Sequence, residues 1–172
     1  MVVMETPRLI FRRLVAGDLD DLCRLYADAD VRRYFPGGTL DRARTRDELD
    51  WFLAGGDPDR PEFSLWATIH KPTDRFIGRS GFVPWTIENS PEIEIAYLLD
   101  KEFWRQGLGV EIARALVQYG FRQLGRTRLI AVIAPMNIAS IKTAERAGFG
   151  FERDAVIDGF PCRVYAQVAI PR

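Results

Sequence analysis

The chain has 172 residues, of which 47% are hydrophobic, and this length and composition suit one folded domain with a full apolar core. Basic and acidic residues number 24 each, so the net charge is zero and no overall field favours nucleic acid or a membrane surface. No apolar stretch approaches the ~20 residues that span a bilayer, and Glu5 and Arg8 break any secretory pattern at the N-terminus. We expect a single cytoplasmic domain over residues 1–172 that binds neither nucleic acid nor membrane.

Few residues of this chain are suited to redox or metal chemistry. Cys23 shares a helical stripe with Leu19, Leu22 and Tyr26, which is typical of a core residue. Together with Cys162 it fits a reducing compartment. With one histidine and no cysteine cluster, we expect no metal site.

The N-terminal third predicts one strand and two helices. Residues 9–14 form the expected strand, and Asp18 is a suitable N-cap for a helix over 19–28. A second helix is expected over 41–54, before a Gly-Gly-Asp-Pro loop at 55–58.

The middle third predicts an antiparallel meander. Three apolar runs with strand character are separated by two turn sequences. The strands are expected at 64–70, 76–85 and 92–99, with turns at 71–74 and 88–91.

Helical spacing begins after Gly109, where apolar residues recur at i and i+4 and form a broad face that should pack on a sheet. Residues 128–134 form a near-continuous apolar run, which is typical of a parallel strand buried on both faces. A short helix is expected over 140–147, ended by Gly148 as a C-cap. Two further strands should follow, at 149–156 and 162–169.

The most informative segment is the turn at 104–109, Trp-Arg-Gln-Gly-Leu-Gly, which joins the apolar run 94–99 to the start of the first of these helices. A strand, a glycine turn and a helix start form an anion site, because successive backbone N–H groups point into one concavity and the helix dipole favours negative charge. Gly107 and Gly109 have no Cβ, so a diphosphate can approach the main chain closely.

Two common phosphate loops do not fit this turn. A dinucleotide fingerprint needs a third glycine and an acidic residue at the end of the next strand. Here Ile112 stands at the position of the third glycine, and the next apolar run ends in Ala134 and Pro135, neither of which is acidic. The Gly-Lys-Ser or Gly-Lys-Thr of a nucleoside-triphosphate loop is absent. The remaining interpretation is a loop for the diphosphate of coenzyme A.

The turn resembles the R/Q-x-x-G-x-G/A motif of the GNAT acetyltransferases, and as Trp-x-x-Gly-x-Gly it is most similar to their RimJ/RimL-type branch of ribosomal-protein N-acetyltransferases. Trp104 departs from the Arg or Gln of the wider family. The resemblance covers nearly the whole chain, including 6–12, 18–22, Asn137-Ile138-Ala139-Ser140 and Gly148-Phe149. It implies an α/β fold with a mixed, mostly antiparallel sheet, flanking helices and a parallel βαβ unit at the cofactor site.

The resemblance implies acetyl-CoA as the acetyl donor. The backbone of six residues would hold its diphosphate: Arg105, Gln106, Gly107, Leu108, Gly109 and Val110. The pantetheine arm would pair with the strand edge at Leu98 and Leu99, where this strand splays from the one at 128–134. Asn137 would hydrogen-bond the pantetheine or order the turn, and the alternative is a plain loop residue.

Acetyl transfer needs a base, because an alkyl ammonium has a pKa near 10, an α-amino group has one near 8, and only the neutral amine attacks. Strand alternation puts Glu92 and Glu94 on one face together with Ala96 and Leu98. Glu94 lies deepest in the strand and resembles the Glu of the branch's Glu-x-Gly-Tyr pattern. It is the first candidate base, directly or through a water, and Glu92 is the second. The alternative is a rim carboxylate that faces water.

The proton donor to the leaving thiolate is less evident. Ala144 occupies the position where many family members have a tyrosine general acid. Ser140, which is also a candidate coenzyme contact, or a water is the expected substitute. The coenzyme thiol, with a pKa near 8.5, is also a tolerable leaving group without an acid.

Candidate acceptor residues come from two segments. Trp85 ends a strand beside the loop 86–91, and the run 31–36 lies in the region that caps the acceptor site of similar enzymes. We therefore select Trp85, Arg33 and Tyr34, with Arg32 or Arg33 as a partner for a carboxylate. Core packing of the tryptophan and a solvated arginine face are the alternatives.

Together these features predict an N-acetyltransferase that moves an acetyl group from acetyl-CoA to a primary amine by direct attack in a ternary complex. The acceptor is a peptide or protein α-amine by resemblance, or a small-molecule amine. A homodimer is kept open because many similar enzymes dimerise. The competing hypothesis is a non-catalytic sensor or scaffold that binds acyl-CoA.

Overall fold

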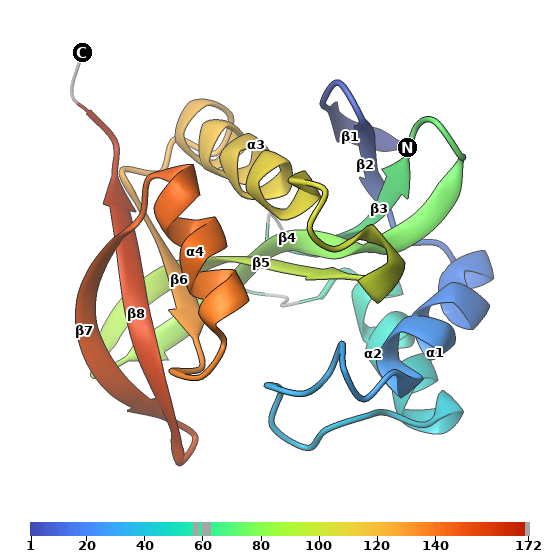
Figure 1. Ribbon diagram of the computed structural model, residues 1–172, viewed down its shortest axis with the longest axis horizontal. Coiled ribbons are helices and arrows are strands. Elements are labelled where there is room, and N and C mark those ends of the chain that lie inside the picture. Colours follow the sequence, from blue (N-terminus) through green and yellow to red (C-terminus); the bar gives the residue numbers. More distant parts are fainter. Residues whose placement is uncertain (57–58, 60–62, 171–172) are drawn as a thin grey trace.

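An eight-stranded mixed sheet forms the centre of the computed structural model, which describes residues 1–56, 59 and 63–170 (Figure 1). The strand order across the sheet is β1-β2-β3-β4-β5-β6-β8-β7. The strands are β1 (Val2–Glu5), β2 (Leu9–Arg13), β3 (Leu65–His70), β4 (Arg75–Ile87), β5 (Ser90–Leu99), β6 (Arg128–Ile133), β7 (Gly150–Ile157) and β8 (Phe160–Val168). The helices are α1 (Leu19–Ala27), α2 (Arg42–Leu53), α3 (Leu108–Arg122) and α4 (Ile138–Ala147).

Neighbouring strands pair antiparallel except β5 and β6, which run parallel. Helix α3 connects these two strands, so β5, α3 and β6 form the predicted βαβ unit. The predicted meander is formed by β3, β4 and β5. In Figure 1, β5 and β6 diverge from each other like the arms of a V, with α4 beside β6.

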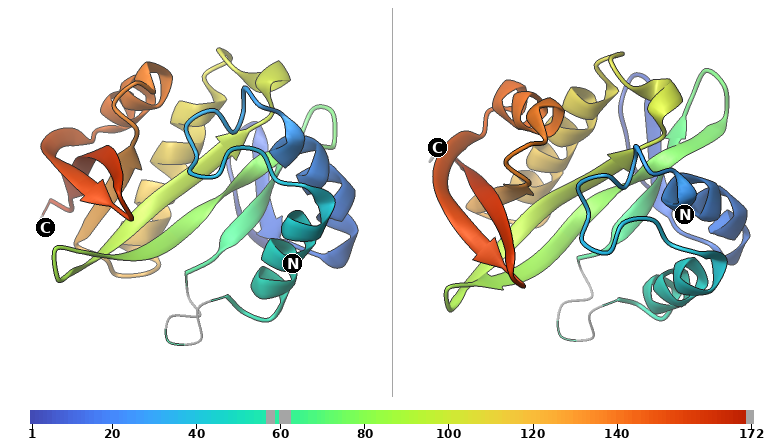
Figure 2. Two further views of the ribbon diagram at one scale, coloured as in Figure 1. Left: turned by 90° about the horizontal axis from the view of Figure 1, so that it is seen from below. Right: turned by 60° about the horizontal axis from the view of Figure 1, so that its bottom comes forward.

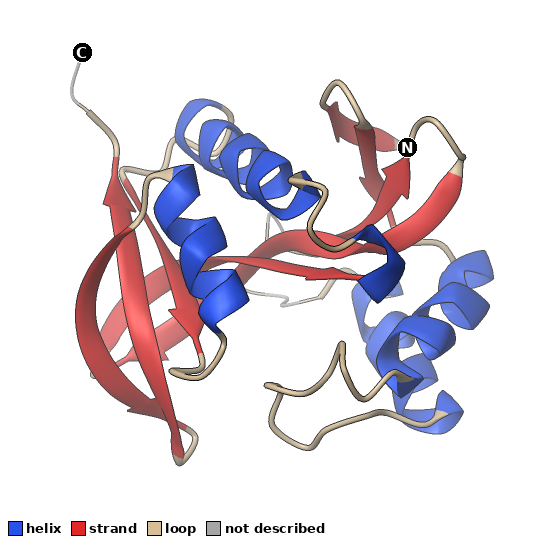
Figure 3. Cartoon of the chain, viewed as in Figure 1, coloured by secondary structure: helices blue, strands red, loops and turns tan. Residues whose placement is uncertain are grey.

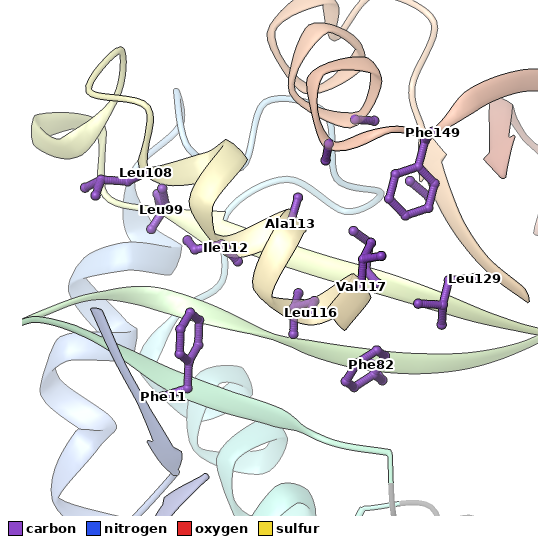
Figure 4. Packing of buried hydrophobic residues seen from close by; sticks show 14 of the residues in the cluster. Phe11, Phe82, Leu99, Leu108, Ile112, Ala113, Leu116, Val117, Leu129 and Phe149 are labelled. Atoms are coloured by element: carbon purple, nitrogen blue, oxygen red, sulfur yellow. The ribbon is translucent and has the colours of Figure 1, made fainter. Parts of the chain in front are cut away.

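Helices cover both faces of the sheet (Figure 3). Helices α3 and α4 pack together, and their apolar residues Ile112, Leu116 and Ile141 share one core cluster with strand residues such as Phe82 (Figure 4). Helices α1 and α2 contribute to a second cluster, which contains Leu98 of β5. Leu98 belongs to this second cluster and its neighbour Leu99 to the first, so side chains of β5 alternate between the two faces as predicted.

Several predicted boundaries needed correction. The edge strand β1 was not predicted, since its four residues gain regular structure only by pairing with β2. The turn predicted at 88–91 is shorter, because Ser90 already pairs with Ile87. Of the loop predicted at 55–58, residues 57 and 58 lie outside the described residues. No helix among the described residues is long and apolar enough to cross a membrane.

Asp18 stands at the N-terminus of α1 as predicted, but its side chain does not cap the helix. It is buried and accepts hydrogen bonds from the Arg12 guanidinium and from the Val15 backbone N–H. The carboxylate therefore ties β2 to a 3₁₀ turn at Ala16–Asp18 that leads into α1.

Candidate active site

The glycine turn forms the N-terminus of α3 with two residues in the left-handed conformation, Arg105 at φ 60° and Gly107 at φ 77°. The backbone N–H of Glu111 donates to the Gly107 carbonyl and is the first hydrogen bond of the helix. The N–H groups of Leu108, Gly109 and Val110 precede it, so they have no intrahelical acceptor and point out of the helix end. This arrangement fits the predicted diphosphate site.

The β1–β2 turn supports this loop from the side. Arg8 donates from Nη1 to the Gln106 carbonyl at 2.8 Å and from Nε to Glu111 at 2.7 Å. Thr6 donates its hydroxyl to the same carboxylate at 2.6 Å. Burial alone would raise the pKa of Glu111, but the hydrogen bonds from Thr6 and Arg8 outweigh it and lower the pKa. Sequence reasoning missed Arg8, whose contacts with the loop span about a hundred residues of chain.

β5 and β6 meet at one pair of residues and then separate. Glu94 stands in register with Ile130, and two residues further along β6 the N–H of Val132 donates to the Glu94 carboxylate at 3.3 Å. The edge of β5 towards Leu98 and Leu99 is therefore left without pairing to β6, as the pantetheine prediction requires. The Leu99 carbonyl accepts a hydrogen bond from the Trp104 indole at 2.9 Å, so Trp104 fixes the start of the glycine turn.

Glu94 occupies this separation point. Its second carboxylate oxygen accepts a hydrogen bond from the Trp85 indole at 2.7 Å, so Trp85 positions the carboxylate. Burial raises the pKa of Glu94 to about 7, against the smaller opposing effects of the Trp85 and Val132 hydrogen bonds and the charge of Arg79. A carboxyl group with a pKa near neutrality is well matched to proton abstraction at neutral pH.

Glu92 has a different environment. It is buried and paired with Arg128, whose Nη2 lies 2.9 Å from a Glu92 oxygen, and Arg128 also binds Glu152 at 2.8 Å. The guanidinium links β5, β6 and β7 through these two carboxylates. This pairing favours a structural role for Glu92.

Ser140 and Asn137 come together at the start of α4. The Asn137 side-chain oxygen accepts the backbone N–H of Ser140 at 3.2 Å, so Asn137 is the N-cap of the helix. The Ser140 hydroxyl lies 3.3 Å from the hydroxyl of Tyr97 on β5. Burial raises the pKa of Tyr97 to about 12, which keeps its phenol protonated at neutral pH. Ala144 is fully buried in the core and carries no polar group.

Sequence reasoning did not find Tyr97 as a candidate, although it follows Glu94 by three residues in the same strand. Strand alternation places Tyr97 on the opposite face of the strand from Glu94, and only the packing of α4 brings its hydroxyl to Ser140.

The acceptor candidates on the α1–α2 connection differ in their exposure to solvent. Arg33 is exposed and pairs with Asp30 at 2.5 Å, and Tyr34 is also exposed. Arg32 instead turns inward and is buried. In both views of Figure 2 this connection extends from α1 and α2 along the face of the sheet towards β5.

An open groove of about 640 Å³ lies against the β7–β8 hairpin. It is lined by residues from the β4–β5 turn, the end of β6 and the β7–β8 hairpin, among them Glu88, Pro135 and Cys162. Burial raises the pKa of the Cys162 thiol, and the nearby charge of Glu94 adds to the effect. One residue of the groove lining, Cys162, is therefore near enough to Glu94 for its charge to act on the thiol.

Comparison with known proteins supports the resemblance found in the sequence. The family model described as an acetyltransferase (GNAT) domain matches residues 8–150. The uncharacterized protein YkkB of Bacillus subtilis (strain 168) is 34% identical over 147 residues, which cover 83% of this chain and 81% of YkkB. A GNAT-family acetyltransferase structure from Bacillus anthracis aligns with a TM-score of 0.82 at 22% identity, over 98% of both chains. RimL, a ribosomal L7/L12 alpha-N-protein acetyltransferase in complex with coenzyme A, aligns at 0.79 and 18% identity, also over 98% of both chains.

Proposed function

Because this chain belongs to the GNAT family of acetyl-CoA-dependent N-acetyltransferases, we propose that it acetylates a primary amine by direct attack in a ternary complex, with Glu94 as the base. The observation that carries the proposal is the position of Glu94. It lies where β5 and β6 separate and has a pKa of about 7. A carboxylate at that place is suited to take the proton of the incoming ammonium.

The donor site is formed mainly by backbone. The N–H groups of residues 105–110 would hold the diphosphate of acetyl-CoA. The guanidinium of Arg8, paired with Glu111, lies beside Gly107 and supports the loop there. The unpaired edge of β5 at Leu98 and Leu99 would bind the pantetheine arm. Asn137 supports this side indirectly by holding Ser140 at the start of α4.

In the reaction, Glu94 accepts a proton from the acceptor ammonium, directly or through a water. The freed nitrogen lone pair attacks the thioester carbonyl and the C–N bond forms. As the C–S bond breaks, the nitrogen releases its second proton to solvent, which leaves a neutral amide. The thiolate then takes a proton from the pair of hydroxyls on Ser140 and Tyr97, which regain it from solvent. Because the thiol has a pKa near 8.5, this protonation contributes less than the base.

The acceptor enters from the side of the α1–α2 connection and the groove at the β7–β8 hairpin. A protein or peptide α-amine is the class that RimL acetylates, and a small-molecule amine fits the same chemistry. We retain Arg33 and Tyr34 as residues at the mouth of this side. The free thiols of Cys23 and Cys162 favour action in the cytoplasm.

The test is turnover of acetyl-CoA, read as thiol release, across a panel of peptides, amino acids, polyamines and aminoglycosides. We expect release with at least one class and mass spectra showing one acetyl group added to its amine. Acetyl-CoA binding without turnover of any amine would support the alternative of a sensor or scaffold.

A further inference from the structure

Two arginines are buried together on the acceptor side of the sheet. Arg32 of the α1–α2 connection and Arg79 of β4 are each 6% exposed. Both guanidinium groups lie over the same two rings, with Arg32 5.2 Å from the centroid of Tyr26 and 4.7 Å from that of Phe35. Arg79 lies 5.4 Å and 5.8 Å from these centroids. We call these four residues the arginine–aromatic cluster.

The polar partners of the cluster leave part of both guanidinium groups unbound. Arg79 donates from Nε to the Tyr26 hydroxyl at 2.5 Å, and this hydroxyl donates to Glu48 at 2.5 Å. Among the described residues, Glu48 is the carboxylate in ion-pair contact with the cluster, 3.8 Å from Arg79, and the more distant charge of Glu94 also acts on Arg79. Arg32 donates from Nε to the Gly38 carbonyl at 2.8 Å, a neutral partner. Two guanidinium groups thus have one carboxylate in direct ion-pair contact.

Four terminal guanidinium nitrogens are left over. Within the part of the chain that the structure describes, the Nη atoms of Arg32 and Arg79 form no hydrogen bond, and none of them is sealed from solvent. Buried charges normally have a charged or hydrogen-bonding partner, because an unpaired one is costly to desolvate. Burial lowers the pKa of Arg32, and the neighbouring Arg79 charge lowers it further. An incoming anion would therefore find free, forked donors.

The cluster lies on the same face of the sheet as the candidate base. Arg79 pairs with Leu98 in the β4–β5 ladder, and Leu98 and Glu94 are four residues apart on one face of β5. Four residues of strand span about 13 Å, and the long side chain of Arg79 can cover part of this distance. Arg79 is also near enough for its charge to act on Glu94.

We propose that the amine acceptor of this enzyme also carries a carboxylate, bound by Arg32 and Arg79 while its amine lies at Glu94. The inference rests on the proposed function and adds the acceptor's second functional group. A carboxylate matches the forked donors, since guanidinium and carboxylate form paired hydrogen bonds. The exposed Arg33, which already pairs with Asp30, does not meet this requirement.

The first experiment compares matched amines with acetyl-CoA as donor: ω-amino carboxylates of increasing length against alkylamines of equal length, and a peptide with glutamate near its N-terminus against its glutamine counterpart. We expect kcat/KM about 10- to 100-fold higher for the carboxylated member of at least one pair. A preference confined to the free amino carboxylates would identify a small-molecule acceptor, and a preference confined to the glutamate peptide would identify a peptide or protein acceptor. Equal rates within every pair, with turnover present, would overturn the proposal.

The second experiment measures binding without turnover. Calorimetry with glutarate as the probe, in the presence of coenzyme A, should show binding to the wild type, a loss of affinity of about 10- to 100-fold in Arg32→Gln, and partial retention in Arg32→Lys. Arg42→Gln is the matched control, because Arg42 is exposed and pairs with Asp20 at the surface. Absence of glutarate binding in the wild type, or equal binding in Arg32→Gln, would overturn the anion site.

The two proposals fail in different ways. Glutarate binding that depends on Arg32, without turnover of any amine, would leave the anion site and remove the proposed catalytic function. Equal turnover of amines with and without a carboxylate would leave the proposed catalytic function and remove the acceptor's carboxylate site.

Discussion

At the scale of single residues, the proposed role of Glu94 as the base depends on how few polar partners surround its carboxylate. The carboxylate receives two hydrogen bonds, from Trp85 and Val132, while burial opposes its ionisation more strongly. Glu92, two residues earlier on the same face, is paired directly with Arg128. Neighbouring carboxylates of one strand are thus suited to different roles by their surroundings.

Replacing Glu94 with Gln should lower kcat at neutral pH by about 10²- to 10⁴-fold with acetyl-CoA binding retained, because the amide cannot accept the proton. The base works as a carboxylate, so wild-type activity should rise with pH through about 7 and be lost as Glu94 is protonated below it. The variant should instead recover towards the amine's own pKa. A pH–rate profile of both proteins gives the measurement.

Glu92→Gln is the control, and it should keep the wild-type pH profile. A deficit in Glu94→Gln that stays constant with pH would mean that Glu94 positions the acceptor and does not take its proton. Fast Glu94→Gln together with slow Glu92→Gln would move the base two residues earlier.

The contact between the hydroxyls of Tyr97 and Ser140 gives a second prediction. Ser140→Ala and Tyr97→Phe should each lower kcat by roughly 10-fold, and the double variant should lose little more than either single one, since the two groups act as one donor. Lower single-turnover rates together with an unchanged KM for acetyl-CoA would show that the chemical step is slower and that acetyl-CoA binding is intact. Fully additive losses would contradict a shared role.

At the scale of secondary-structure elements, glycines allow close approaches that side chains would prevent. A Cβ built on Gly109 would lie 3.4 Å from Thr143 on α4, an ordinary contact. A Cβ on Gly81 of β4 would lie 2.0 Å from the Ser64 carbonyl, a distance that the backbone cannot accommodate without moving. Packing within the protein therefore requires a glycine at position 81 and does not require one at position 109.

Gly109→Asp should fold and lose coenzyme affinity by on the order of 3–4 kcal/mol, because its carboxylate would face the diphosphate at short range. Gly109→Ala, which adds the Cβ without the charge, is the matched control and should bind more tightly than the aspartate variant. Calorimetry with coenzyme A measures both. Wild-type affinity in a folded Gly109→Asp protein would refute the assignment of the diphosphate site.

Gly81→Ala should destabilise the protein by more than roughly 3 kcal/mol, since β4 would have to move away from the residues that precede β3. Gly150→Ala is the control, because a Cβ at that strand position meets nothing within 4 Å. Urea unfolding of the two variants gives the comparison. Equal midpoints would show that the segment before β3 is not held in place.

At the scale of the whole molecule, the proposed donor site joins parts of the chain that are distant in sequence. Arg8 from the N-terminal strands binds Gln106 and Glu111, and Ser140 from α4 meets Tyr97 from β5. A ligand that contacts these elements together should stabilise the folded chain as a unit.

Acetyl-CoA at about 100 times its dissociation constant should therefore raise the free energy of unfolding by about 2.7 kcal/mol, if the unfolded chain does not bind it. ATP and NAD, which lack the pantetheine arm, should protect much less. Thermal unfolding with each ligand at the same concentration is the measurement. Equal protection by ATP or NAD would favour a nucleotide site instead.

The sequence by itself determined the order of the helices and strands after β1 and the position of the glycine turn, because these depend on local periodicity and on residues without a Cβ. It selected Glu94 as the candidate base from alternation within one strand and from the family resemblance. It could not give β1, whose four residues become a strand only through a partner. It also could not separate Arg32 from Arg33, since both occupy the same polar run and only the packing of that segment against Tyr26 and Arg79 buries one of them. The pairing of Glu92 with Arg128 and of Tyr97 with Ser140 likewise joins residues more than thirty positions apart. Such contacts were decided by the tertiary structure, because burial and charge pairing depend on which elements pack together.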